Sequence, residues 1–374
     1  MKHQLLIGRT CLFAAAFFPL HVAPPVLSDQ TFSDAMGSYN NVGLTLAYHV
    51  GFALAAVLML IWGALARAIV GRWKLFAPIT LIAGFATLTD ISLLQVFGRL
   101  GLGGSAVVLL AGFYRNLKID NGYHQLPMIF GLSALFLESG GLIVGLVVKN
   151  WGFRPALGLS WSFLAAASVC AVVLLREKNE SSKVLEAVRF DFSGSTAFMG
   201  VAVLAYGGFF LMLLSLSTLA GLPDGPIISG LAIFSTAFAF SAGNLIPFEK
   251  IKWIGSPAQL VLFGTLCSTI GSALVWHGIV STRGLMIVSG AATVAFGNGI
   301  TVSRCFQRAS LVSSDGYSGS ILTMLGVMVL TVVLTIGSET IGASAPIAQL
   351  LAFLLAFTVI FAHGITNAFS SHRV

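Results

Sequence analysis

Charged residues are scarce in this sequence: 20 Lys and Arg and 13 Asp and Glu make up only 9% of its 374 residues. An ordinary soluble domain carries about 25%. Hydrophobic residues, in contrast, account for 57% of the chain. A soluble protein of this length needs a much larger polar surface, so the composition excludes a soluble globule and predicts that apolar side chains face lipid.

Patterns typical of several function classes are also missing. The net charge of +7 is scattered between apolar runs, whereas a nucleic-acid-binding protein gathers its basic residues into one patch. The four cysteines stand apart, without metal-ligand or redox spacing. No phosphate-binding loop, dinucleotide fingerprint or nucleophile elbow is present. We therefore expect no enzymatic activity, cofactor, metal or nucleic-acid partner, and an ion gradient as the energy source.

Twelve apolar runs have about the 20 residues that a helix needs to cross a bilayer. They cover residues 5–27, 42–66, 75–91, 93–113, 125–148, 155–175, 196–219, 226–247, 256–277, 284–303, 317–337 and 344–366. The third run is the weakest, because only a few polar residues separate it from the fourth. Since the runs are apolar on nearly every face, strands of a membrane barrel are excluded. The sequence predicts an all-α polytopic membrane protein with twelve transmembrane helices.

The first run has a second interpretation. Lys2 and Arg9 before an apolar stretch resemble a secretory signal peptide. The stretch continues to Leu27 without a convincing small-residue cleavage site, and its removal would leave an odd number of spans. We interpret it as the first transmembrane helix.

The distribution of Lys and Arg predicts the orientation. With a cytoplasmic N-terminus, 16 of the 20 fall inside, and only Lys149, Arg154 and Arg283 fall outside, while Arg99 lies within the fourth run. Because cytoplasmic loops are rich in basic residues, both termini are expected in the cytoplasm of a cell that carries the protein in its inner (plasma) membrane.

A mixed-charge segment divides the chain into two halves of six runs. We predict an N-terminal half over 1–175, a cytoplasmic linker over 176–195, which alternatively forms a short surface helix, and a C-terminal half over 196–374. Gly63 and Trp73 recur as Gly243 and Trp253, an offset of 180 residues in both cases. This recurrence indicates that the halves are repeats.

Several local patterns occur in the order known from one family of transporters. They are Arg99-Leu-Gly-Leu-Gly103-Gly104-Ser105-Ala106 in the fourth run, Gly140-Gly141 and Gly145 in the fifth, Asn150-Trp151-Gly152-Phe153-Arg154 before the sixth, and Gly316 to Ser320 entering the eleventh. With twelve runs split six and six, the chain resembles the major facilitator superfamily, and in particular its bicyclomycin-resistance-type drug:proton antiporters. The resemblance implies the major facilitator fold, a small-molecule substrate, proton coupling that involves Arg99, and glycines that act as conformational motifs. The Gly-Pro pair usual in the fifth span of antiporters is missing.

The loop after the second run departs from the family pattern G-x-x-x-D-R-x-G-R-R. It begins at Gly63, carries Arg67 at the acidic position, and has its Gly71-Arg72 pair one residue late. In the family, the acid ties this loop to neighbouring helix ends and steadies the outward-facing state. The altered loop leaves open the alternative of a membrane protein that no longer transports.

Two ionisable residues fall deep inside predicted spans, where an unpaired charge costs several kcal/mol. Arg99 lies about 9 Å and Glu138 about 15 Å from the outer ends of the fourth and fifth runs, at 1.5 Å per residue. We expect the two side chains to pair. In the functional interpretation, Glu138 takes up a proton, favoured by burial and opposed by Arg99, until the two separate. In the alternative, the pair only fixes helix packing.

Further polar residues are candidates for substrate binding. His21 and His49 lie about 10 Å deep in the first two runs. Either residue relays protons or contacts substrate. In the alternative, each is only a hydrogen-bonded residue of the helix packing. In the second half the candidates are Tyr206, Asn244 and Asn298. Because the half is rich in Phe and Met, an amphipathic molecule fits better than a sugar.

Together these observations predict a proton-coupled secondary transporter, monomeric in the lipid bilayer, that exports a small amphipathic molecule. The alternatives are a proton-driven uptake permease and a non-transporting membrane sensor or partner protein built on the same fold.

Overall fold

The computed structural model describes residues 2–27, 32, 41–89, 91–175, 189–192, 194–217, 225–246, 256–341 and 345–371. Within these ranges the chain forms thirteen α-helices and two 3-10 turns. The only β interaction there is an isolated bridge between Phe190 and Ser313. The prediction of an all-α membrane fold is confirmed.

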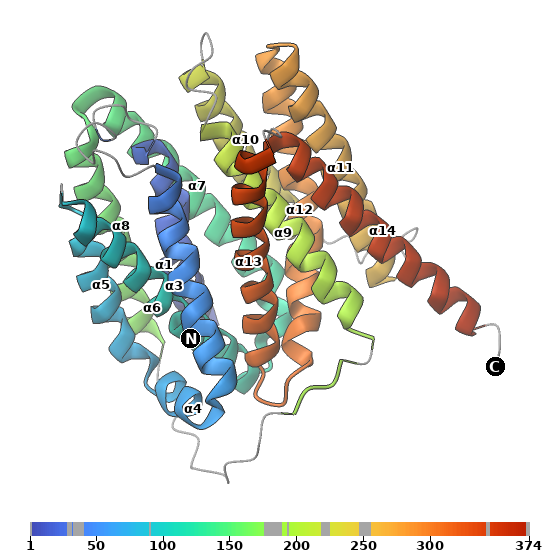
Figure 1. Cartoon of the computed structure of the whole chain (residues 1–374). Helices are drawn as coiled ribbons and strands as arrows, with labels where there is room; N and C mark the ends of the chain where they lie inside the picture. Colours follow the sequence, from blue (N-terminus) through green and yellow to red (C-terminus); the bar gives the residue numbers. More distant parts are fainter. Residues whose placement is uncertain are drawn as a thin grey trace. The chain divides into compact units, whose positions relative to one another are not determined.

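A helix lies on every predicted span (Figure 1). The elements are α1 (Lys2–Leu27), α3 (Asn41–Ile61), α4 (Gly63–Gly71), η1 (Trp73–Leu75), α5 (Phe76–Ala86), α6 (Ser92–Ile119), η2 (Gly122–Gln125), α7 (Leu126–Trp151), α8 (Phe153–Leu174), α9 (Thr196–Ser217), α10 (Gly225–Leu245), α11 (Pro257–Val280), α12 (Gly284–Leu311), α13 (Ser318–Ile341) and α14 (Ala345–Ser371).

Most of these helices have the length and composition of membrane spans. Among the described residues, nine are long and apolar enough to cross a bilayer, and α3 with α4 forms a tenth candidate as a bent pair. Two further apolar helices, Trp73–Ala86 and Leu231–Leu245, are shorter. The chain is thus a multi-pass membrane protein.

The second and third spans end earlier than predicted. At Trp62 the backbone leaves the helical region (φ −101°, ψ 63°), so α3 stops at Ile61 and a separate helix, α4, begins at Gly63. The segment expected to be a loop is therefore helical. In the third span, α5 ends at Ala86, where the Thr87 hydroxyl donates to the Gly84 carbonyl at 2.7 Å. A hydrogen bond inside the turn thus replaces the predicted continuation to residue 91.

The helices form two compact units, named here the N-unit and the C-unit. The N-unit comprises Met1–Gln125, Leu132–Phe190 and Ser313–Val329, and the C-unit comprises Leu126–Gly131, Asp191–Val312 and Leu330–Val374. Helices α7 and α13 contribute to both units. The division into halves at 176–195 stays a prediction, and residues 176–188 of that linker lie outside the described residues.

In the N-unit, α3 and α6 pack with their backbones in direct contact. A Cβ atom on Gly51 would lie 2.1 Å from the Leu100 carbonyl oxygen, and one on Gly103 would lie 2.0 Å from the Tyr48 carbonyl oxygen. Only glycine permits such an approach. The fourth-span glycine motif therefore serves helix packing.

The C-unit uses the same device between α10 and α12. A Cβ atom on Gly243 would lie 2.3 Å from the Phe296 carbonyl oxygen, and one on Gly299 would lie 2.2 Å from the Phe240 carbonyl oxygen. Helices α3 and α6 are the second and fourth predicted spans, and α10 and α12 are the eighth and tenth. The corresponding pairs of the two predicted repeats are thus joined in the same way. Trp253, part of the sequence repeat, lies outside the described residues.

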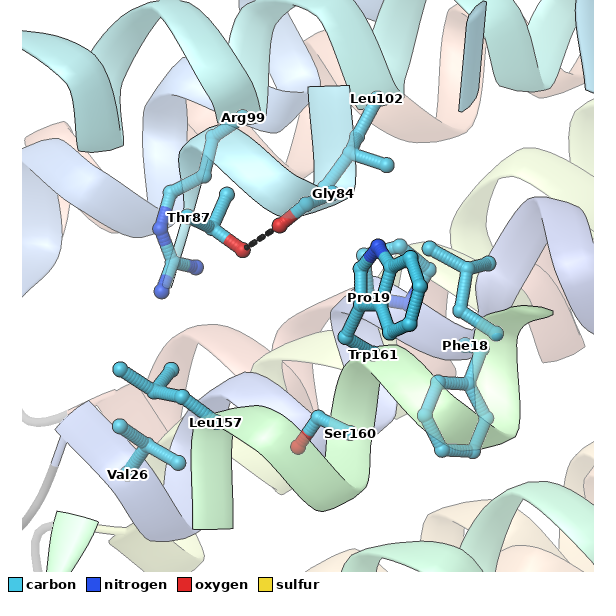
Figure 2. A pocket seen from close by; sticks show the side chains of 11 residues that line it. Phe18, Pro19, Val26, Gly84, Thr87, Arg99, Leu102, Leu157, Ser160 and Trp161 are labelled. Carbon is cyan, nitrogen blue, oxygen red and sulfur yellow. Dashed lines mark hydrogen bonds between the residues drawn. The ribbon is translucent and has the colours of Figure 1, made fainter. Parts of the chain in front are cut away.

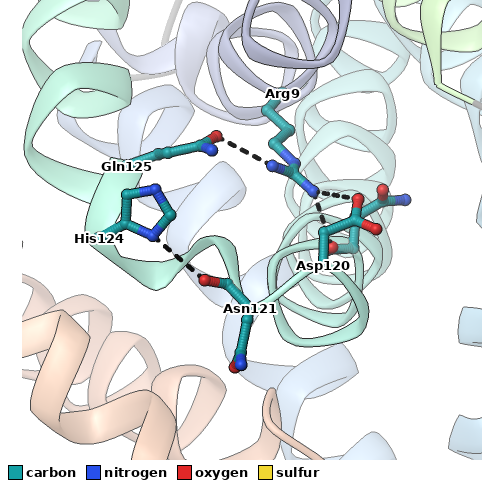
Figure 3. A network of polar contacts seen from close by, with 6 residues as sticks. Arg9, Asp120, Asn121, His124 and Gln125 are labelled. Carbon is teal, nitrogen blue, oxygen red and sulfur yellow. Dashed lines mark hydrogen bonds and ion pairs between the residues drawn. The ribbon is translucent and has the colours of Figure 1, made fainter. Parts of the chain in front are cut away.

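A buried arginine fastens α1 to the turn between α6 and α7 (Figure 3). The Arg9 side chain is 1% exposed, and its Nη2 lies 2.6 Å from Asp120 Oδ2. The same guanidinium donates to Gln125 Oε1 at 2.9 Å and to the Asn116 carbonyl at 3.0 Å. Sequence analysis counted Arg9 only among the positive charges expected on the cytoplasmic side. In the structure it is a buried residue that holds α1 within the N-unit.

The Asp120→Asn variant is expected to lose about 2 kcal/mol of stability, because a buried guanidinium keeps its hydrogen bonds but loses its counter-charge. The measurement is the thermal unfolding midpoint of the purified protein in detergent. Lys149→Gln, which changes an exposed charge, is the control. An Asp120→Asn midpoint equal to that of the control would contradict the role given to this contact.

Candidate functional site

A buried polar contact in the N-unit joins α1 to α7. His21 Nδ1 lies 2.9 Å from Glu138 Oε1, and the two side chains are 4% and 3% exposed. The proton positions on the imidazole follow its protonation state. Two titratable groups from different helices thus share one hydrogen bond in apolar surroundings.

Glycines on α7 make this contact possible. A Cβ atom on Gly141 would lie 2.9 Å from the His21 carbonyl oxygen, and one on Gly140 would lie 2.8 Å from the Phe18 ring. Residues three apart on a helix share a face, so Gly141 and Glu138 both face α1. The glycine pair therefore brings α7 close enough for the carboxyl group to reach the imidazole. Gly145 continues this glycine spacing one turn further along α7.

The Gly141→Val variant is expected to separate His21 from Glu138 while both residues stay in place, since the added side chain forces α7 away from the α1 backbone. We expect proton-coupled transport to fall, together with some loss of stability from the overpacked contact between α1 and α7. Gly158→Val on α8 is the control, because no atom lies within 4 Å of a Cβ at that position. Equal transport by both variants would show that the close approach is unimportant.

The predicted pair between Arg99 and Glu138 is wrong. Within the described part of the chain, the hydrogen bond of the Arg99 side chain runs from Nε to Gln95 Oε1 at 3.4 Å, and the ion-pair partner of Glu138 is His21. Arg99 instead lines a pocket with residues of α5 and α8 (Figure 2). The depths of the two residues allowed a pair, but the face of α6 that carries Arg99 is turned towards those helices.

His49 has a different environment from His21. It is 2% exposed on α3, and its ring stands edge-on to Tyr48 with 6.1 Å between centroids. Of the two histidines predicted as candidates, His21 is the one hydrogen-bonded to Glu138. The role of His49 stays a prediction.

The candidates of the second half all lie buried in the C-unit. Tyr206 packs in an aromatic cluster, with ring centroids 4.7 Å from Phe210 and 6.1 Å from Phe306. Asn244 Nδ2 donates to a main-chain carbonyl at 3.0 Å, whereas its Oδ1 has no hydrogen-bond partner in the described part of the chain. Asn298 is 0% exposed, and neither amide atom has such a partner there. Buried amides are normally satisfied, so water or a bound molecule is expected at these groups.

Sequence analysis missed Gln349 on α14, which shares these properties. It is 0% exposed, and both its amide atoms lack a hydrogen-bond partner among the described residues. The signal was available, because a lone amide inside an apolar run is the pattern that selected Asn298.

The altered motif after the second predicted span forms the short helix α4 and its end. Gly63 begins the helix, Arg67 lies in its middle, Gly71 ends it, and the Arg72 N–H donates to the Ile69 carbonyl at 2.9 Å. A Cβ atom on Gly71 would lie 3.2 Å from a guanidinium nitrogen of Arg115. The motif residues thus lie next to the C-terminal part of α6.

An acid stands at the start of α13, within the N-unit. Asp315 Oδ1 accepts the backbone N–H groups of Tyr317 and Ser318 at 3.0 and 2.9 Å and so caps the helix. Burial and the Asp315 charge raise the pKa of the Tyr317 phenol, while Arg67 and Arg115 act on it in the opposite direction. Arg67 and Asp315 thus both act on the Tyr317 phenol, and sequence analysis did not single out Asp315.

Neither protein-family models nor curated protein sequences match the chain. Solved structures of other proteins are similar over almost its whole length. The human organic anion transporter MFSD10 (TETRAN) is 13% identical with a TM-score of 0.61, covering 96% of this chain and 98% of its own. An auto-inhibited peptide transporter of the POT family is 12% identical with a TM-score of 0.58, covering 97% and 96%. The E. coli fucose:proton symporter FucP is 15% identical with a TM-score of 0.61, covering 96% and 97%.

At these identities the likeness establishes the fold. The chain has the major facilitator fold that these transporters share. The finer resemblance to bicyclomycin-resistance-type antiporters stays a prediction.

Proposed function

We propose that this protein is a proton-coupled secondary transporter that exports a small amphipathic molecule by alternating access between its two six-helix halves. It acts as a monomer in the inner (plasma) membrane with both termini in the cytoplasm. The observation that supports this proposal most directly is the buried contact between His21 and Glu138.

The contact suits proton coupling because its two groups are easiest to bury when they hold one proton between them. The pair is then net neutral, either as imidazole with carboxylic acid or as imidazolium with carboxylate. Adding or removing a proton leaves a net charge in apolar surroundings, which is costly unless water reaches the pair. Proton exchange is therefore tied to the conformation that admits water, which is the requirement for coupled transport.

The C-unit supports an amphipathic substrate. Asn244 Oδ1 and both amide atoms of Asn298 are buried without hydrogen-bond partners among the described residues, and Tyr206 stands in an aromatic cluster. A few polar groups among aromatic walls are typical of sites for small, largely apolar ligands.

Everted membrane vesicles with an acidic interior test the proposal. A pH-sensitive dye reports the gradient while lipophilic cations, lipophilic anions and small metabolites are added in turn. A compound that dissipates the gradient with the wild type but not with Glu138→Gln supports proton-coupled export, with Lys149→Gln as the control. Silence across the panel from inserted, folded protein would contradict it and favour the non-transporting alternative, to which the altered motif at Arg67 points.

Proton-driven uptake is the second candidate, favoured by the missing proline after Gly140 and Gly141. One of the similar structures is also named as a proton symporter. Right-side-out vesicles distinguish the two directions: accumulation of the compound with an acidic exterior indicates uptake, whereas accumulation only in everted vesicles with an acidic interior indicates export.

A further inference from the structure

Two of the four cysteines come together in the N-unit, although they stand far apart in the sequence. Cys11 on α1 and Cys170 on α8 share a hydrogen bond between their thiol groups. Both are free thiols, and both are partly exposed. No spacing in the sequence connects them, so the fold alone creates this dithiol pair.

The packing of α1 against α8 sets the register of the two helices. A Cβ atom on Gly8 would lie 2.9 Å from the Leu175 side chain, so the helices approach closely at this end. Further along α1, the Phe18 ring lies 5.8 Å from the Phe163 ring, measured between centroids. As α1 advances from residue 8 to residue 18, the facing position on α8 therefore runs back from 175 to 163. This is the register of two antiparallel helices.

The same register places the two cysteines opposite each other. Cys11 follows Gly8 by three residues, and Cys170 precedes Leu174 by four. A Cβ atom on Gly8 would lie 3.0 Å from Leu174 Cβ, so these two positions face each other directly. Residues three or four apart share a helix face, and both cysteines therefore lie where α1 meets α8. Helix register and hydrogen bond thus lead independently to the same pair.

The surroundings of the pair restrict what the two sulfurs can hold. Both cysteines lie inside candidate membrane spans, His3–His21 and Phe153–Leu174, where a charged thiolate is costly. Among the described residues, no third Cys, His, Asp or Glu joins the pair in a possible metal site, whereas structural zinc takes four ligands. The pair therefore suits a soft centre that needs only two bonds to sulfur and leaves an uncharged product.

We propose that Cys11 and Cys170 form a dithiol site for a trivalent organoarsenical of the type R–As=O. Two As–S bonds form, the arsenic–oxygen bond breaks, and the two thiol protons leave with the oxygen as one water molecule. Arsenic stays trivalent, so nothing is oxidised or reduced, and the bridged product carries no charge. The inference does not depend on the proposed transport activity, because it concerns two thiols of one unit.

The test adds phenylarsine oxide to the purified full chain in detergent, after reduction with a phosphine that is then removed. Intact mass spectrometry reports the number of phenylarsenic groups on each chain. We expect one group that ethanedithiol removes and an equal thiol concentration of mercaptoethanol does not, because a monothiol cannot replace both bonds in one step. Ready removal by mercaptoethanol would show attachment through a single sulfur and would overturn the proposal.

Single substitutions identify the two sulfurs. Cys11→Ser and Cys170→Ser are each expected to weaken binding at least about a hundredfold, because the second As–S bond of the wild type forms within one molecule. Cys267→Ser is the matched control, since Cys267 is also a partly exposed free cysteine but lies on α11 in the C-unit. Unchanged binding in Cys11→Ser or in Cys170→Ser, or an equal loss in Cys267→Ser, would contradict the assignment.

A measurement on the wild type keeps the test decisive if a substituted protein folds poorly. The bridged product requires the native packing of α1 against α8, so bound phenylarsine oxide is expected to raise the thermal unfolding midpoint of the wild type. Ethanedithiol is expected to return the midpoint to its starting value. A midpoint that phenylarsine oxide leaves unchanged or lowers would overturn the proposal.

Discussion

Glu138→Gln is expected to reduce proton-driven transport to the level of vesicles without the protein, while exchange of substrate down its own gradient continues. The glutamine side chain keeps the shape of the carboxylic acid and can still hydrogen-bond His21 Nδ1 across the 2.9 Å contact. It cannot accept or release a proton, so the pair loses the chemistry required for coupling. The measurement compares uphill accumulation with downhill exchange of the same compound in vesicles.

A second substitution separates coupling from packing at this contact. His21→Gln leaves the titratable carboxyl group in place and removes the imidazole, so we expect transport to continue at a lower rate with an altered pH dependence. Asp120→Asn, which alters another buried ion pair of the N-unit, is expected to lower stability and leave the coupling intact. If Glu138→Gln still accumulates substrate against its gradient, the pair has no role in coupling.

Gly103→Ala is expected to destabilise the protein severely, by about 3 kcal/mol, whereas Gly104→Ala at the next position is tolerated. A Cβ atom at residue 103 would lie 2.0 Å from the Tyr48 carbonyl oxygen, which forces the backbones of α3 and α6 apart. At residue 104 the nearest atom, the Gly51 carbonyl oxygen, is 3.8 Å away, which is ordinary contact. At residue 104 the higher helix propensity of alanine, worth up to about 1 kcal/mol, therefore decides whether the stability rises or falls.

Thermal midpoints and the yield of monodisperse protein in detergent measure this difference. The two variants share chemistry, helix and membrane depth, so they differ only in what the new methyl group meets. Equal midpoints would mean that α3 and α6 are not in backbone contact.

The fold was predictable because lipid leaves a chain few options. Apolar runs such as the one that became α9 satisfy their backbone only as helices, so composition and run length sufficed to predict an all-α membrane fold. The ends of the second and third spans were harder to predict. The break at Trp62 and the early stop at Ala86 depend on local backbone geometry and on a turn held by Gln95, which hydropathy does not report.

The sequence identified residues of the candidate site but did not predict which of them contact each other. Glu138, Arg99 and His21 stood out because ionisable groups inside spans are expensive. Depth can be counted along a helix, but the facing partner depends on helix rotation, which packing decides. Gly141 brings His21 to Glu138, while Arg99 is turned towards α5 and α8. The contact between Arg9 and Asp120 was missed for a related reason: both residues lie near predicted span ends, where a charge looks solvated.

The most direct test of the account is the number of protons moved per molecule of substrate. Purified protein in liposomes is given a compound identified in the vesicle screen, and an internal pH-sensitive dye and labelled compound are followed together. The account predicts a fixed proton-to-substrate ratio for the wild type and for Lys149→Gln, and substrate movement without proton movement for Glu138→Gln. An unchanged ratio in Glu138→Gln would contradict the claim that the His21–Glu138 contact couples transport to protons.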